Sequence, residues 1–392
     1  MKIIHCSDLH LDSKMKSNLD SKKAKERRNE ILITYQNMVK YAVENNVKII
    51  IIAGDMFDKK NITQKARNIV IDTIKFNPEI DFIYLKGNHD EAGFLEQIEE
   101  IPSNLKLFTN TGWTSYRYGK VVISGIEFGE VSNYEIYSTL MLNKNDINIV
   151  TLHGQEVKYD QKDKAEIINI QSLKNKNIDY LALGHIHKFK QERIDSRGIY
   201  CYSGCLEGRG FDECGEKGFV LLDVDEEENK ITSKFIPFAG RHLYEVSVDI
   251  TDTLTTLDVE EKIDNSVKDI EKEALIKIIL TGKVDINSER DINYLEKKYK
   301  NMFYFAKIYD ETILKIDYMK YYKNANKILV ICVLLLILVL IPGIGTIRNG
   351  SRSWFGIGSF GIQPSEFTKL SLIIFTSKYL SNNDKLLKNI KK

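Results

Sequence analysis

The fold can be predicted from the stretch VKIIIIAGDMFD, residues 47–58, in which an isoleucine-rich run leads directly into a glycine and an aspartate. Its first half is rich in isoleucine, as buried strands are, and a glycine and an aspartate follow directly. Segments 24–45 and 64–75 instead have the apolar spacing of helices. Further strand-like runs occupy residues 2–8, 80–90, 120–128, 148–154, 178–187, 200–204 and 217–225. Strand–helix alternation of this kind predicts an α/β core with buried strands.

The bulk composition is that of a globular protein. A length of 392 residues suggests two or three domains, and 43% hydrophobic with 28% charged residues is ample for a core. The formal net charge is only +1, so any nucleic-acid binding must come from a local basic face. Five scattered cysteines, and a strand-like run directly after Met1 in place of a signal peptide, favour a reducing cytoplasm.

The pattern changes twice along the chain. From about residue 238 the sequence predicts strands at 241–249, 275–282 and 303–309 and a helix at 259–273, which together indicate a small α+β domain. Residues 328–341 (ILVICVLLLILVLI) contain no charge, and the apolar run approaches the roughly 20 residues of a membrane-spanning helix. We therefore expect domains at 1–237, 238–312 and 313–392, the last one membrane-associated.

Five of the seven histidines fall at or just after the end of a strand-like run, together with carboxylates and glycines. In open α/β sheets, ligands bind outside the carboxyl ends of the strands. An i, i+2 pair of extended residues points to one side, so each such pair can hold one ion. Imidazole, carboxylate and amide oxygen without thiolate suit manganese, iron or zinc better than calcium. The elements are Asp8-Leu9-His10, Gly54-Asp55-Met56-Phe57-Asp58, Gly87-Asn88-His89-Asp90, His153-Gly154 and Gly184-His185-Ile186-His187.

Each of these elements taken alone has an ordinary interpretation. Asp-x-His and Gly-Asn-His-Asp are compatible with surface turns, and a single histidine such as His153 is more often a hydrogen-bonded core residue. Five of them in chain order, each closing a predicted strand, indicate one shared metal site.

The five elements resemble the signature of the calcineurin-like metallophosphoesterases, over residues 1–225. The segment YSGCLEGRGFDE, residues 202–213, is similar to the one that follows the last histidine pair in SbcD-type exonuclease subunits, with the closest likeness to the YhaO-like bacterial branch. Residues 237–241 (PFAGR) and those after them resemble the capping domain of that family. The implied fold is a layered α/β/β/α sandwich with a small α+β capping domain.

The resemblance also implies a role for each site residue. Asp8, His10 and His187 would hold one divalent ion, and Asn88, His153 and His185 the other, with Asp55 bridging the two; manganese is the expected metal. His89 would assist the transition state or protonate the leaving oxygen, and Asp58 would orient His89. Two such ions lower the pKa of a shared water for in-line attack on a phosphodiester.

The implied function is a DNA exonuclease or endonuclease subunit in DNA repair, with DNA, an SbcC-type ATPase and a second copy of the chain as partners. The helices that normally contact the ATPase follow the capping domain, and other sequence replaces them here. A phosphoesterase acting on nucleotides or phosphoproteins, and a membrane-anchored scaffold without catalysis, are the alternatives. Basic residues that could meet phosphates, or form a solvated helix start, are Lys14, Lys16, Lys22, Lys23, Lys25, Arg27 and Arg28.

Residues from about 315 onward resemble part of the SEDS family, which includes FtsW, RodA and SpoVE. The likeness rests on 316–318 (IDY), the apolar run with PGIG at 342–345, 349–354 (NGSRSW) and 363–367 (QPSEF). A fragment this short does not imply polymerase activity. Lysines before and after the segment, at 320, 323, 327, 385, 388, 391 and 392, indicate a hairpin with both ends cytoplasmic. Residues 328–380 or so would then tether a cytoplasmic catalytic domain to the membrane.

Overall fold

The computed structural model describes residues 1–15, 19–58, 62–90, 95, 98, 100–128, 133–157, 167–315, 317–348, 350–356 and 361–383, with 133–135 as backbone alone. The chain forms two compact units. The first comprises residues 1–282 and 289–312, and the second comprises 283–288 and 313–392.

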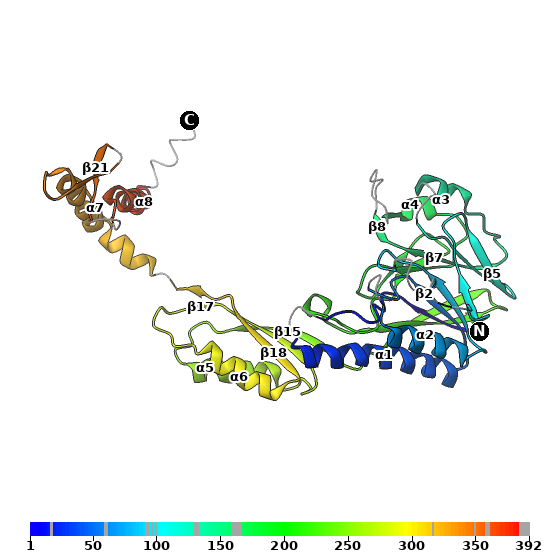
Figure 1. Ribbon diagram of the computed structural model, residues 1–392. Coiled ribbons are helices and arrows are strands. Elements are labelled where there is room, and N and C mark those ends of the chain that lie inside the picture. The colour runs from blue at the N-terminus through cyan, green and yellow to red at the C-terminus, as the bar shows by residue number, and fades with distance from the viewer. Residues whose placement is uncertain are drawn as a thin grey trace. The chain divides into compact units, whose positions relative to one another are not determined.

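The first unit is built around two six-stranded sheets (Figure 1). In the first sheet, four parallel strands are extended by an antiparallel pair at the β1 edge. Its order is β14 (Lys230–Pro237), β13 (Gly218–Asp225), β1 (Lys2–Cys6), β2 (Val47–Ala53), β3 (Asp81–Leu85) and β4 (Leu105–Leu107). Helices α1 (Ser21–Glu44) and α2 (Gln64–Lys75) lie side by side and pack on this sheet.

The second sheet has parallel strands in the centre and an antiparallel strand at each edge. Its order is β11 (Lys190–Arg193), β12 (Ile199–Tyr202), β10 (Tyr180–Gly184), β7 (Ile147–His153), β6 (Val121–Gly125) and β5 (Thr114–Tyr118). Its outer face is covered by α3 (Asn133–Thr139) and α4 (Ile170–Leu173). A short parallel pair, β8 (Gln155–Val157) with β9 (Ile167–Asn169), follows β7.

Alternation along the strands explains the layers. On β2, Ile49 and Ile51 point into the core between the two sheets, whereas Ile50 and Ile52 point toward α1 and α2. All four isoleucines are fully buried, as expected when both faces of a parallel sheet are covered. The predicted α/β/β/α sandwich is thus confirmed, and each predicted strand overlaps an observed one.

The small domain alternates strand and helix. Its parallel strands β15 (Leu243–Asp249), β16 (Leu275–Thr281) and β18 (Phe305–Asp310) are connected through α5 (Thr256–Val267) and α6 (Ile292–Met302). This parallel arrangement is closer to α/β than to the expected α+β. The helix predicted at 259–273 instead begins with a capping box at Thr255 and Asp258 and ends at Val267. The sequence pattern gave no prediction of α6.

The small domain docks on the start of α1. Arg241 pairs with Glu30 and lies 3.7 Å from the ring centre of Tyr304, whose carbonyl oxygen accepts a hydrogen bond from Lys23. An apolar cluster of Leu243, Leu275 and Phe305, against which Leu19 and Phe211 pack, accompanies these contacts. Both charged and apolar groups therefore fix the small domain to the sandwich.

The second unit contains the C-terminal segment. Its elements are β17 (Lys283–Val284), β19 (Ile313–Leu314), α7 (Tyr318–Leu340), β20 (Thr346–Arg348), β21 (Ser351–Trp354) and α8 (Pro364–Asn382). Helices α7 and α8 pack together (Figure 1). Among the described residues, only α7 is long and apolar enough to cross a membrane, and large side chains such as Val330, Ile331 and Leu334 on it are exposed. Ile316, Asn349, Lys385, Lys388, Lys391 and Lys392 lie outside the described residues.

Candidate metal centre

The predicted site residues come together at one rim of the sandwich, where the parallel strands end. Asp8 and His10 follow β1, Asp55 follows β2, and His185 follows β10, and all four have left-handed backbone (φ 51°, 43°, 53° and 104°). Such conformations cost free energy for non-glycine residues and concentrate at functional sites. Hydrogen bonds from the Asp8 and His10 amides to the carbonyls of Gly54 and Asp55 hold the two loops together.

Two glycines at the rim are required because neighbouring groups approach too closely for a side chain. A Cβ at Gly184 would lie 1.9 Å from the carbonyl oxygen of Ala53. A Cβ at Gly54, which has φ +94°, would lie 2.1 Å from Nδ1 of His153. The glycines predicted to provide tight turns therefore also make room for the ligands.

The first group of converging donors is Asp8, His10 and His187. The Nε2 atoms of His10 and His187 are 3.2 Å apart, and Oδ1 of Asp8 is 3.8 Å from Nε2 of His187. Asp8 is only 1% exposed, and its carboxylate accepts hydrogen bonds from the Ser7 hydroxyl and the His185 amide. Two imidazole nitrogens and a buried carboxylate thus face one small space.

The second group surrounds His153. Its Nδ1 is 2.9 Å from the carbonyl oxygen of Ala53, which can only accept, so Nδ1 carries the proton. Nε2 therefore faces the centre, 3.0 Å from Oδ1 of Asn88 and 3.4 Å from Oδ2 of Asp55. The His185 ring is edge-on to the His153 ring, with 5.4 Å between ring centres. All seven predicted ligands thus lie at this rim.

Asp55 lies between the two groups. Its Oδ2 is 3.9 Å from Nε2 of His10 and 3.4 Å from Nε2 of His153, while Oδ1 accepts the amide of His89 at 2.9 Å. Burial raises the pKa of Asp55, but the interaction with His153 outweighs it and the pKa falls to about 2. Asp55 is therefore a carboxylate that faces both histidine groups at once.

The electrostatics of the centre suit cations. Within the described part of the chain, the ion pairs of Asp8 and Asp55 are with histidines alone, so two buried carboxylates have no lysine or arginine partner. Burial lowers the pKa of His153, yet Asp55 raises it to a net value of about 9. The field that holds a proton on His153 would equally attract a metal ion, so the donor set fits divalent metals.

Asp58 and His89 lie beside the first donor group. Oδ1 of Asp58 is 3.3 Å from Nδ1 of His10 and 3.7 Å from Nδ1 of His89, and Ser13 donates a hydrogen bond to Oδ2. The side chain of His89 is 48% exposed, whereas that of His10 is buried. Asp58 is therefore closer to a predicted ligand than to the predicted acid.

Three residues of the site were not predicted from sequence. Asp90 is buried and accepts hydrogen bonds from the amides of Met56, Phe57 and Gly87, which joins the loops after β2 and β3. Burial raises the pKa of Asp90 to about 6. Glu213 and Arg209 approach from the 202–213 segment. All three stand in motifs that the sequence already singled out, but their partners are distant in the chain.

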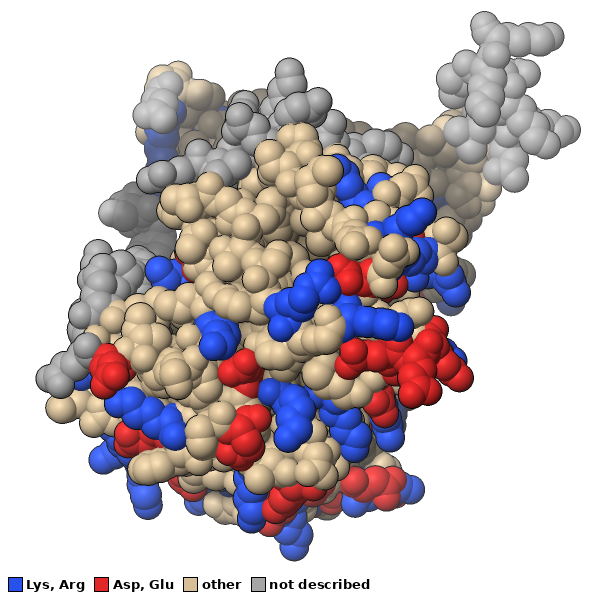
Figure 2. Space-filling view, turned by 90° about the vertical axis from the view of Figure 1, so that its right-hand side faces the viewer, with Lys and Arg blue, Asp and Glu red and all other residues tan. Residues whose placement is uncertain are grey.

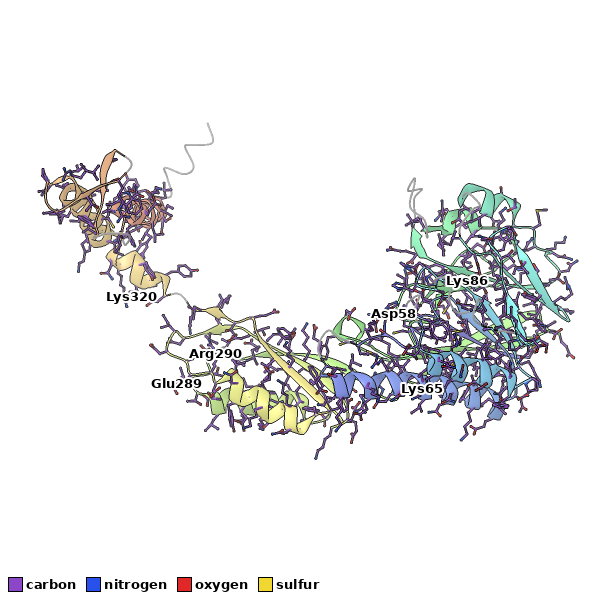
Figure 3. All side chains as sticks on the ribbon, in the orientation of Figure 1. Asp58, Lys65, Lys86, Glu289, Arg290 and Lys320 are labelled. Carbon is purple, nitrogen blue, oxygen red and sulfur yellow. The ribbon has the colours of Figure 1, made fainter. Side chains whose placement is uncertain are left out.

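The basic residues near the N-terminus are only partly free to meet a phosphate. Arg27 is 1% exposed and pairs with Glu207 and Glu30, so it belongs to the core and not to a binding surface. Lys23 donates to the Tyr304 carbonyl, and Lys16 lies outside the described residues. On the face shown in Figure 2, basic and acidic side chains are interspersed. Figure 3 shows Asp58, Lys65 and Lys86 on the sandwich domain.

Comparison with known families finds a different match for each end of the chain. Residues 1–189 match the family described as calcineurin-like phosphoesterase. Residues 283–392 match the FtsW, RodA and SpoVE family, described as cell cycle protein. Both resemblances noted from the sequence are thereby confirmed, and the first unit contains a metal-dependent phosphoesterase domain for two divalent ions.

Individual known proteins are likewise similar either to the metallophosphoesterase part of the chain or to its C-terminal part. The YhaO protein of Bacillus subtilis, an uncharacterized metallophosphoesterase, is 24% identical over 301 residues, which cover 72% of this chain and 72% of YhaO. The DNA double-strand break repair protein Mre11 of Sulfurisphaera tokodaii is 27% identical over 341 residues, covering 81% of this chain and 84% of that protein. Stage V sporulation protein E of Bacillus subtilis is 44% identical over 102 residues, 24% of this chain, and the match spans only 28% of that protein.

Proposed function

We propose that this chain, which combines a calcineurin-like metallophosphoesterase domain with a C-terminal region of the FtsW, RodA and SpoVE family, is a two-metal DNA nuclease of the SbcD type. The observation that carries the proposal is the position of Asp55. Its Oδ2 faces a histidine of each donor group, at 3.9 Å and 3.4 Å, which is the arrangement that a carboxylate shared by two cations requires.

The proposed ligands divide around Asp55. Asp8, His10 and His187 would hold one ion, and Asn88, His153 and His185 the other. When bound, such ions supply a nucleophile at neutral pH and neutralise charge on the phosphoryl oxygens. The donors are imidazole, carboxylate and amide with no thiolate, which suits manganese, iron or zinc. Among these metals manganese is our proposal, on the basis of the resemblance to SbcD-type subunits.

His89 is the proposed proton donor to the leaving oxygen. Its backbone amide is anchored on Asp55, and its half-exposed ring leaves room for a substrate to approach. Because Nδ1 of His89 faces Asp58 at 3.7 Å, Nε2 is the atom available to the substrate. Asp58 would set the direction of both the His89 and the His10 rings.

DNA is the proposed substrate because the match to the Mre11 relative covers 81% of this chain, far more than the catalytic motifs; the name of that relative refers to repair of double-strand breaks. An SbcC-type ATPase and a second copy of the chain are proposed partners on the same basis. Action on nucleotides or phosphoproteins by the same centre is the competing proposal.

We further propose that α7 anchors the protein in the membrane. It is 23 residues long, and its exposed apolar side chains have no protein cover among the described residues of the second unit. Fractionation of cells that express a tagged full-length chain tests this proposal. A product found wholly in the soluble fraction would contradict it.

The substrate proposal can be tested with the full-length protein purified in detergent. We expect manganese-dependent cleavage of end-labelled linear duplex DNA, and loss of cleavage in the Asp55→Asn variant. Hydrolysis of bis(p-nitrophenyl) phosphate without DNA cleavage would favour the nucleotide or phosphoprotein alternative. If the protein binds manganese and hydrolyses neither substrate, the non-catalytic scaffold is the better explanation.

A further inference from the structure

In the first donor group, the two imidazoles each contact a carboxylate through the ring nitrogen that faces away from the centre. Nδ1 of His187 is 2.6 Å from Oε1 of Glu213, and Nδ1 of His10 is 3.3 Å from Oδ1 of Asp58. The opposite nitrogens of the two rings, both Nε2, meet at 3.2 Å. Each ring therefore has one nitrogen facing a carboxylate and the other facing the centre.

Glu213 is fixed by an unusually full set of donors. Its carboxylate accepts hydrogen bonds from the Arg209 amide at 2.7 Å and from Nη2 of the Arg209 guanidinium at 2.7 Å. The Glu213 side chain is 4% exposed, and together with its His187 contact these bonds leave it little freedom. A carboxylate that is paired with an arginine in this way can only accept a hydrogen bond from Nδ1 of His187.

Arg209 connects the two carboxylates. Its Nη1 is 3.3 Å from Oδ1 of Asp58, and its Nη2 donates to Glu213. The guanidinium thus lies between the two carboxylates that contact the imidazoles, and it balances their two negative charges, which would otherwise be costly to bury. A planar fork of donors is suited to hold two carboxylates in a fixed mutual position.

The 202–213 segment, which contains Arg209 and Glu213, is itself anchored in the core. Glu207 accepts hydrogen bonds from Arg27 at 3.1 Å, from Thr34 at 2.7 Å and from the Gly240 amide at 2.6 Å. Arg27 also donates to the Gly208 carbonyl at 2.9 Å. The support behind His187 therefore rests on α1 and on the start of the small domain.

From this geometry we propose that Glu213 and Arg209 are positioning residues of the metal centre. Glu213 fixes the tautomer and the direction of the His187 ring so that Nε2 faces the first ion. Arg209 holds the carboxylates of Glu213 and Asp58 in fixed positions relative to each other. Side chains that form a hydrogen bond with a metal ligand typically contribute 10- to 100-fold to metal affinity. The inference rests on the proposed metal ligands, but not on DNA as the substrate.

The test compares manganese binding by calorimetry in three full-length proteins. Glu213→Gln keeps the size of the side chain and removes the charge that Arg209 and His187 share. Glu216→Gln is the matched control, because Glu216 is exposed and only three residues further along the chain. We expect one of the two manganese sites to weaken by about 10- to 100-fold in Glu213→Gln and neither site to change in the control. Affinities within threefold of the wild type at both sites, in a folded variant, would overturn the proposal.

A second measurement covers the case in which Glu213→Gln does not fold. The wild-type protein, labelled with 15N-histidine and loaded with diamagnetic zinc, is examined by NMR, with His187→Gln used to assign the signal. A proton on Nδ1 of His187 is the expected result, and an Nδ1 without a proton would refute the role of Glu213. Failure of the nuclease proposal would look different: the wild type would bind two manganese ions and leave DNA intact.

Discussion

Replacement of His89 by alanine separates metal binding from proton transfer. The side chain of His89 is 48% exposed, and its only ion pair in the described part of the chain is the 3.7 Å approach to Asp58. A surface side chain of this kind contributes less than about 0.5 kcal/mol to folding stability. The amide that holds Asp55 belongs to the backbone and survives the substitution.

The expected kinetic effect is much larger than the effect on stability. Loss of a positioned general acid lowers turnover by about 10²- to 10⁴-fold. The donors of the two groups do not include the His89 ring in our assignment, so His89→Ala should bind two manganese ions with wild-type affinity.

The assay is manganese-dependent hydrolysis of bis(p-nitrophenyl) phosphate and of end-labelled duplex DNA, with manganese binding measured on the same samples. His242→Ala is the matched control, because His242 has a similar side-chain exposure of 42% and pairs with Glu271 in the small domain. Loss of a bound ion in His89→Ala would show that His89 is a ligand. Unchanged turnover would show that it transfers no proton.

Three further predictions address the centre and its support. Asp55→Ala should lose both manganese ions and all activity, and retention of either ion in calorimetry would argue against a shared carboxylate. Gly184→Ala should destabilise the fold by about 1–3 kcal/mol, since its Cβ would meet the Ala53 oxygen at 1.9 Å, and an unchanged denaturation midpoint would contradict this. Burial raises the pKa of Glu30, but Arg241 and Arg27 bring it below the ordinary value of 4.5. The stability difference between wild type and Glu30→Gln should therefore be constant above about pH 5 and shrink as the pH falls below 4.5; a difference that grows on acidification would be inconsistent with the ion pair.

Local sequence was sufficient to predict the sandwich and the collection of its site residues. Runs such as 47–53 are short and rich in isoleucine, as strands covered on both faces are, and neighbouring parallel strands end at a common rim. Asp8 and Asp55 follow neighbouring parallel strands of one sheet, so their convergence follows from topology. His153 ends a strand of the other sheet, and the packing of the two sheets brings it to the same rim.

Other features required the tertiary structure, because they depend on partners far apart in the chain. Arg27 reads as one of several basic residues at a helix start, and only the fold buries it against Glu207, 180 positions away. Glu213 and His187 are 26 positions apart, and no local pattern indicates that a carboxylate will meet Nδ1 of that ring.

The small domain shows the same limit. Strand and helix propensities predict its three strands and one of its two helices, but the parallel pairing of β15, β16 and β18 is decided by long-range packing. The sequence therefore determines which residues can bind metal and at which strand ends they stand. The directions of their side chains are set by buried charges and backbone conformations that exist only once distant segments have packed together.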